Sequence, residues 1–211
     1  MALVKMNKLQ LNEAAGYLEK FTASFKGKSF IKDAYQKLSW CYYLQGNMKA
    51  AEATRKKLLA KGSTDTDPDK KAQKDAKAGH WPNSLLLRAR LLSDGGYHQE
   101  ALNALSGKSK NDFGKTAEQL EFVYRLGRIY DDLRRDEEAI QYYQQAIQIG
   151  KNRSEYFAAR AALQTGQIYE RQGKKTQAIA YYQKCLDMED HEYKDSMDQR
   201  AKAGIQRCKG E

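Results

Sequence analysis

The chain has 211 residues, of which 41% are hydrophobic and 30% are charged, and its 37 Lys and Arg against 27 Asp and Glu give a formal charge of +10. This hydrophobic content is enough for a continuous core and argues against disorder of the whole chain. No apolar run reaches the roughly 18 residues that span a bilayer. The only two prolines, Pro68 and Pro82, leave long stretches free to be helical, which favours an all-α fold.

The N-terminal segment, residues 1–28, is predicted to be a partial first repeat. One helix is expected from Met6 to Phe25, with Ala14 and Leu18 on an apolar face. This terminal face, which includes Leu11, would allow two copies of the chain to pair as a homodimer.

Glycine-containing turns divide the rest of the chain into helical hairpins. Gly46, Gly96 and Gly173 each interrupt the apolar periodicity, and glycine ends a helix readily in the left-handed conformation. We therefore predict a single repeat domain over residues 1–211, with hairpins at 29–61, 82–109, 116–150 and 152–190 and a C-terminal capping helix at 191–211. Residues 62–81 form a polar insertion, with a short polar helix expected from Asp69 to Ala78.

Self-similarity is clearest in the second half of the chain. The unit from Glu121 to Gly150 contains Leu126, Gly127, Tyr130, Ala139, Tyr143 and Ala146. Its counterpart contains Gly166, Tyr169, Ala178, Tyr182 and Cys185, each 39 positions later (166 − 127). Small residues at these positions let two antiparallel helices approach closely, and the tyrosines fill the space between neighbours. Weaker units lie at Tyr35, Leu38, Ser39, Tyr42, Gly46 and Ala51, and at Leu85, Ala89, Leu92, Gly96, Ala101 and Leu105.

This pattern resembles the tetratricopeptide repeat family, whose usual unit is about 34 residues, so the excess is assigned to the connection around residues 150–156. The resemblance implies a tetratricopeptide-like right-handed α-solenoid whose first helices line a concave groove that receives peptides or proteins. Applying that register to this sequence places the following residues in the groove: Trp40, Tyr43, Arg90, Tyr124, Arg128, Asp131, Arg160, Gln167 and Glu170. Trp40 has an equally weighted alternative, which is to fill space between adjacent repeats.

The family also has a co-chaperone subclass that clamps a terminal carboxylate with a Lys followed four residues later by Asn. The corresponding positions here hold pairs such as Tyr124 and Arg128, so this clamp is absent.

The sequence contains no motif for catalysis, a cofactor or a metal. The histidines are isolated, and no nucleophile elbow or zinc-ligand spacing occurs. We therefore predict a non-catalytic scaffold or adaptor with a protein or peptide ligand, no cofactor, no metal and no small-molecule substrate. Two alternatives stay open: a basic repeat that binds nucleic acid, with affinity that falls steeply with salt, and an accessory domain of a larger enzyme.

Three cysteines, Cys41, Cys185 and Cys208, form no closely spaced pair, which fits a reducing compartment. The compartment is not determined by the sequence. The cytoplasm is the default, and a leader removed from a longer parent protein would instead indicate a periplasmic or exported location.

Overall fold

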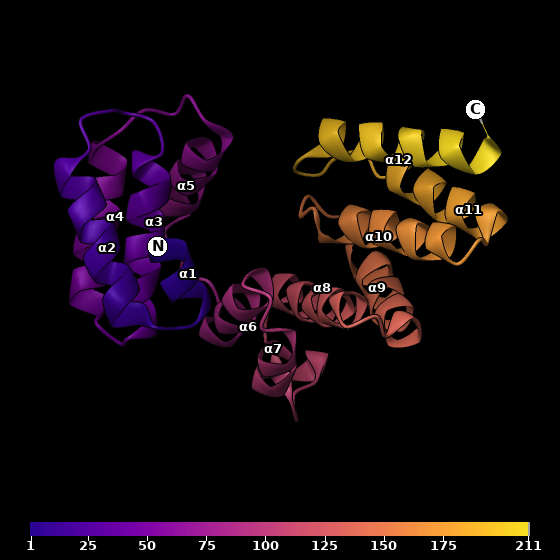
Figure 1. Cartoon of the computed structure of the whole chain (residues 1–211), viewed down its shortest axis with the longest axis horizontal. Coiled ribbons are helices and arrows are strands. Elements are labelled where there is room, and N and C mark those ends of the chain that lie inside the picture. Colours follow the sequence, from indigo (N-terminus) through magenta and orange to yellow (C-terminus); the bar gives the residue numbers. More distant parts are fainter. Residues whose placement is uncertain (211) are drawn as a thin grey trace. The chain divides into compact units, whose positions relative to one another are not determined.

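The computed structural model describes residues 1–210, which form α-helices, one short 3-10 turn and connecting loops, with no strand among them. The fold is an all-helical repeat, as predicted. The chain divides into two compact units, Met1–Tyr97 and His98–Glu211 (Figure 1).

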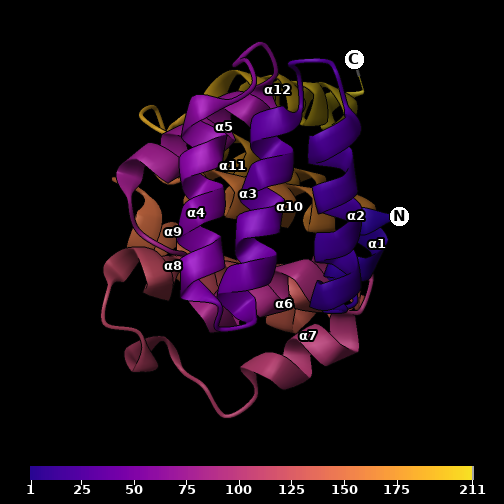
Figure 2. The same cartoon turned by 90° about the vertical axis from the view of Figure 1, so that its left-hand side faces the viewer.

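Unit 1 contains the helices α1 (Ala2–Asn7), α2 (Leu11–Ser24), α3 (Ile31–Leu44), α4 (Met48–Ala60), α5 (Asp67–Ala78) and α6 (Ser84–Asp94). Helix α3 lies at its centre, flanked by α2, α4 and α5 (Figure 2). Its apolar side carries Ile31, Tyr35 and Leu38, which are buried in one cluster together with Leu18 of α2 and Leu58 of α4. Burial of this shared apolar face holds the helices of unit 1 together.

The prediction of one helix from Met6 to Phe25 is wrong. Leu9 adopts a left-handed backbone (φ 57°), which separates α1 from α2. The buried Met6 and Leu11 flank this break, and both belong to the core of unit 1. Tertiary burial on both sides of the turn therefore outweighs the helical periodicity that runs through it.

Unit 2 contains α7 (His98–Leu105), α8 (Thr116–Asp132), α9 (Asp136–Gly150), α10 (Phe157–Arg171), α11 (Lys175–Leu186) and α12 (Lys194–Lys209). From α8 onward each helix packs against the next (Figure 1). The residues in excess of the usual repeat length lie between α9 and α10, at 151–156.

Tyr182 shows why glycine is required at the close contacts of unit 2. This buried ring lies between Gly166 of α10 and Gly204 of α12. A Cβ atom added at either glycine would lie within 2.6 Å of a ring carbon of Tyr182. In the preceding hairpin, a Cβ atom added at Gly127 would likewise lie 2.6 Å from a ring carbon of Tyr143.

The turn between α8 and α9 has no glycine, and Arg134 takes the left-handed conformation there (φ 61°). The predicted hairpin at 82–109 includes α6 of unit 1 and α7 of unit 2, so its pairing and the single domain over 1–211 stay predictions. The predicted capping helix corresponds to α12, and its last residue, Glu211, lies outside the described residues.

Candidate functional site

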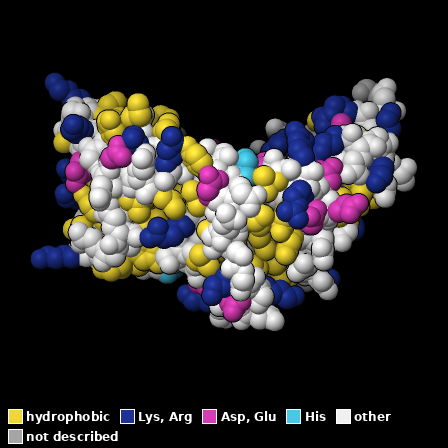
Figure 3. Space-filling view, turned by 60° about the horizontal axis from the view of Figure 1, so that its bottom comes forward, with side chains coloured by type: hydrophobic (Ala, Val, Ile, Leu, Met, Phe, Trp, Pro, Cys, Tyr) yellow, Lys and Arg dark blue, Asp and Glu magenta, His cyan; other side chains and the backbone are white. Residues whose placement is uncertain are grey.

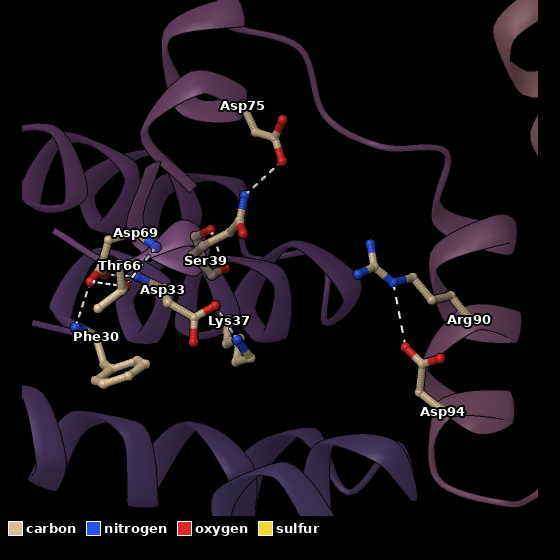
Figure 4. A network of polar contacts seen from close by, with 10 residues as sticks. Phe30, Asp33, Lys37, Ser39, Thr66, Asp69, Asp75, Arg90 and Asp94 are labelled. Atoms are coloured by element: carbon tan, nitrogen blue, oxygen red, sulfur yellow. Dashed lines mark hydrogen bonds and ion pairs between the residues drawn. The ribbon is translucent and has the colours of Figure 1, made fainter. Parts of the chain in front are cut away.

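In unit 1, the polar segment after α4 packs against α3 instead of extending into solvent. Asp69 of α5 is fully buried and accepts hydrogen bonds from the backbone N–H groups of Phe30 (2.5 Å) and Asp33 (3.0 Å) at the start of α3 (Figure 4). Thr66 donates its hydroxyl to the same carboxylate at 2.6 Å. Desolvation would raise the pKa of Asp69, but these hydrogen bonds outweigh it and lower that pKa below its usual value. Asp69 therefore caps the start of α3 through N–H groups that lie 39 and 36 positions earlier in the sequence.

The rest of α5 covers the neighbouring surface of α3. Ala72 and Ala76 enter the core of unit 1, and Gln36 of α3 donates to the carboxylate of Asp75 at 3.1 Å (Figure 4). Gln36 lies one helical turn before the predicted groove residue Trp40 on α3. In unit 1 this surface is therefore occupied by the chain itself.

Tyr43, one of the predicted groove residues, is engaged by the end of the same segment. The ring of Trp81 stacks on Tyr43 with centroids 4.9 Å apart, and the Tyr43 hydroxyl donates to the carbonyl of Pro82 at 2.9 Å. Arg55 lies over the ring of Trp81, with its guanidinium carbon 5.0 Å from the ring centroid. Both aromatic side chains are half-buried.

Trp40 and Arg90, also predicted groove residues, lie together in unit 1. The guanidinium carbon of Arg90 is 5.5 Å from the ring centroid of Trp40, and Arg90 forms an ion pair with Asp94 at 3.5 Å (Figure 4). Trp40 is half-buried against the core of unit 1. The structure thus brings this pair together while Trp40 also fills space beside the core.

In unit 2, Asp131 connects three helices. This buried carboxylate accepts hydrogen bonds from Tyr143 of α9 (3.3 Å) and from Gln164 and Arg171 of α10 (3.4 and 2.8 Å). Arg171 also contacts Asp136 at 2.6 Å. Asp131 therefore holds the first helices of successive hairpins in register.

Glu170 performs a similar task between α10 and α12. It accepts two hydrogen bonds from Arg207 (2.7 and 2.9 Å) and one from the hydroxyl of Tyr182. Gln167, one turn earlier on α10, is half-buried. Among the predicted groove residues, Asp131 and Glu170 thus fix the packing of helices.

The remaining predicted residues, Tyr124, Arg128 and Arg160, meet in one place. Tyr124 is 2% exposed, and its ring packs 5.0 Å from that of Phe157. Burial raises the pKa of the Tyr124 hydroxyl, and the positive charges of Arg125, Arg160 and Arg128 oppose that rise. Three guanidinium groups therefore surround one buried phenol on α8.

Two of these arginines have carboxylate partners. Arg125 binds Glu121 at 2.8 Å and Arg128 binds Asp132 at 2.9 Å. Burial would lower both pKa values, but the carboxylates outweigh it and raise them, so both arginines stay charged. We call Arg125, Arg128, Arg160 and Tyr124 the arginine cluster.

Comparison with protein-family models finds that residues 119–189 match the tetratricopeptide repeat family. Residues 119–189 thus form a tetratricopeptide repeat segment of the chain. The matched segment covers about a third of the chain and contains α9, α10, α11 and most of α8. Comparison with curated proteins finds no match.

Tetratricopeptide repeats are in general modules for protein–protein interaction and are not typically catalytic. The arginine cluster lies within the matched segment, on the first helices of its two hairpins. Trp40, Tyr43 and Arg90 lie outside the match.

Metal binding, membrane spanning and thiol reactivity can each be assessed for the described residues. Among residues 1–210, no group of His, Cys, Asp and Glu is arranged to hold a metal ion. No helix within that range has the length and apolar character needed to cross a membrane. The three cysteines are buried free thiols, and burial raises the pKa of Cys41 and of Cys185 to about 12, which makes these two thiols poor nucleophiles at neutral pH.

A hollow of about 310 Å³ lies between the α9–α10 and α11–α12 connections. Its lining combines Lys151, Arg153 and Glu155 with the acidic Asp187 and Glu189. Arg153 and Glu155 neutralise each other at 2.7 Å. Lys151 is then the single remaining cation against Asp187, Glu189 and Asp190, so the lining of the hollow has a net negative charge.

Sequence reasoning did not identify Arg125 or the docking of α5. Arg125 occupies the position next to Tyr124, and Glu121 four residues earlier is the signal that could have revealed its ion pair. For α5, the signal is the spacing of Asp69, Ala72 and Ala76, which places three small or capping residues on one helical face. The low overall hydropathy of the segment obscures this narrow face.

Proposed function

We propose that this chain is a non-catalytic scaffold that binds a peptide or protein segment across α8 and α10 of unit 2. The observation that carries the proposal is the arginine cluster, which the repeat packing fixes on neighbouring first helices. Arginine at a partly desolvated position, with aromatic neighbours, is a common anchor in protein interfaces. Arg128 and Arg160 are half-buried, so each presents part of its side chain to solvent.

The equivalent face of unit 1 is a weaker candidate. Asp69 and Gln36 tie α5 to α3, and Trp81 covers Tyr43. A partner would have to displace these contacts before it reached α3, and that displacement would cost binding free energy. Binding at α8 and α10 requires no such rearrangement within unit 2.

Charge distribution supports a protein partner over nucleic acid at this face. Unit 1 has 18 Lys and Arg against 9 Asp and Glu, a formal charge of +9, whereas unit 2 has 19 against 18, a charge of +1. On the face in Figure 3, Lys and Arg side chains are dispersed among hydrophobic and uncharged ones. A nearly neutral unit 2 lacks the general excess of positive charge on which nucleic-acid affinity depends.

The test is selection of binders from a random displayed peptide library, followed by affinity measurements on two matched variants. Arg128→Ala removes an arginine and its ion pair with Asp132 from α8, and Arg135→Ala removes an arginine and its ion pair with Glu138 from the α8–α9 turn. We expect Arg128→Ala to weaken the selected peptides about tenfold or more, as loss of an interface anchor does, and Arg135→Ala to leave affinity within about twofold. Equal affinity of both variants would place binding elsewhere. Failure to select any peptide, with oligonucleotide binding at low salt, would favour the nucleic-acid alternative.

A further inference from the structure

Arg160 differs from the other arginines of α8 and α10. Arg125 and Arg128 each have a carboxylate partner, and Arg171 has two, Asp131 and Asp136. Within residues 1–210, Arg160 forms no ion pair, and its Nε is enclosed without an acceptor. Leaving a buried donor without an acceptor is unfavourable, so such a group in a folded protein calls for an explanation.

No carboxylate on α10 can supply the missing acceptor. One helical turn on either side of Arg160 brings Tyr156, Phe157, Leu163 and Gln164, none of which is acidic. Across the interface, Glu121 is bound to Arg125 and Asp132 is bound to Arg128. The three guanidinium groups of the arginine cluster thus face two carboxylates, Glu121 and Asp132, which leaves one positive charge without a counter-charge.

We propose that Arg160 is the recognition point for a carboxylate side chain, so that the segment bound across α8 and α10 is an acidic stretch of a partner protein. This inference rests on the proposed function and specifies the chemistry of its ligand. A carboxylate would provide the missing counter-charge, and it would bind the outer N–H groups of the Arg160 guanidinium, since the Nε itself is enclosed. The half-buried guanidinium loses less hydration on binding than a fully exposed one, which favours pairing at this site over the exposed lysines of the surface.

The site is distinct from a clamp for a chain terminus. Tyr124 and Arg128 occupy the positions where such a clamp has Lys and Asn, and Tyr124 is buried. The single unpaired guanidinium predicts recognition of one Asp or Glu within a segment and does not require a free C-terminus.

The experiment combines peptide selection with a double-mutant cycle. Random displayed peptides are selected on the wild-type chain and on two variants, Arg160→Gln and Arg200→Gln. Arg200→Gln is the matched control, because it replaces an exposed arginine of α12 with glutamine. We expect enrichment of Asp and Glu in peptides selected on the wild type and on Arg200→Gln, and loss of that enrichment on Arg160→Gln. Each acidic residue of a selected peptide is then changed to its amide. One such change should weaken binding to the wild type about tenfold and leave binding to Arg160→Gln nearly unchanged.

Four outcomes would overturn the inference, and they differ in whether the proposed function also fails. Peptides that bind α8 and α10 without acidic enrichment, or acidic peptides with no coupling to Arg160, overturn the inference and leave the proposed function standing. Absence of any peptide binding overturns both. Oligothymidylate that competes with the selected acidic peptides at physiological salt would show that phosphate, not carboxylate, is the ligand, and would also overturn the inference. Hydrogen exchange on each variant checks that folding is retained.

Discussion

Units 1 and 2 are both all-helical, but they differ in net charge and in the contacts of their candidate groove residues. Unit 1 has nearly all of the excess positive charge and covers α3 with its own polar helix α5. Unit 2 has a charge of +1 and stacks regular hairpins whose carboxylates neutralise most of the arginines between them. The difference shows that the regularity of a repeat determines which residues are left available to a partner. In unit 1 the candidate groove residues are engaged within the chain, whereas in unit 2 one arginine lacks a counter-charge.

The largest expected effect on stability follows from removing the ring of Tyr182, which fills the space between α10 and α12 in unit 2. Tyr182→Ala should lower the free energy of unfolding of unit 2 by about 3–5 kcal/mol, the usual cost of truncating a buried aromatic residue to alanine. Tyr17→Ala removes an exposed tyrosine from α2 and should change stability by less than about 0.5 kcal/mol. Hydrogen exchange resolved by mass spectrometry assigns each effect to its unit. A larger increase in exchange rate in unit 1 than in unit 2, relative to the wild type, would contradict the assignment of Tyr182 to the packing of unit 2.

The second prediction concerns the attachment of α5 to α3. Asp69→Ala leaves the N–H groups of Phe30 and Asp33 without their acceptor and should destabilise unit 1 by about 2–3 kcal/mol. Both tryptophans lie in unit 1, so urea unfolding followed by tryptophan fluorescence reports on this unit. Asp65→Ala, in the exposed loop before α5, is the matched control and should have little effect. Equal midpoints for the two variants would show that the cap is not needed.

The third prediction is that a Gly→Ala substitution lowers the stability of unit 2 at one position and raises the stability of unit 1 at another. Gly166→Ala would bring a Cβ to 2.6 Å from the ring of Tyr182 and should destabilise unit 2 by about 1–3 kcal/mol. Gly16→Ala adds a Cβ inside α2 that meets no other group within 4 Å, and it should stabilise unit 1 by about 0.5–1 kcal/mol, because alanine loses less conformational entropy in a helix. Thermal unfolding of both variants is the measurement. A destabilised Gly16→Ala would mean that α2 has a neighbour at that position in solution.

The smallest expected effect is the acid dependence of unit 1. The pKa of Asp69 is lowered in the folded chain, so its contribution to stability is present above its unfolded pKa of about 3.9 and is lost as pH falls through the lower folded value. The stability difference between the wild type and Asp69→Asn should therefore narrow as pH falls from neutral towards about 3. Tryptophan fluorescence in urea measures both proteins at each pH. A difference that stays constant would show that the charge of Asp69 does not contribute.

Much of unit 2 could be predicted from sequence because its packing rule is local. Gly127 with Tyr143, and Gly166 with Tyr182, occur at spacings set by one hairpin, and the structure brings each glycine against its tyrosine. The ion pairs of Arg125 and Arg128 also follow helical spacing. Even the isolation of Arg160 can be read from the sequence, since no acid lies one turn away on α10.

Unit 1 was less predictable because its decisive contacts join distant segments. The carboxylate of Asp69 and the N–H of Phe30 are 39 residues apart, and so are Tyr43 and Pro82. No periodicity relates such pairs, and the polar composition of α5 indicated a solvated insertion. The break at Leu9 was hidden for a similar reason, since it depends on burial of Met6 and Leu11 in a core assembled from several helices.

The most direct test of the account is hydrogen exchange of the whole chain with and without a saturating selected acidic peptide. We expect added protection on α8 and α10, at residues 116–132 and 157–171, with no change on α3 at residues 31–44. Protection on α3, with release of α5, would contradict this expectation and would place the binding face in unit 1.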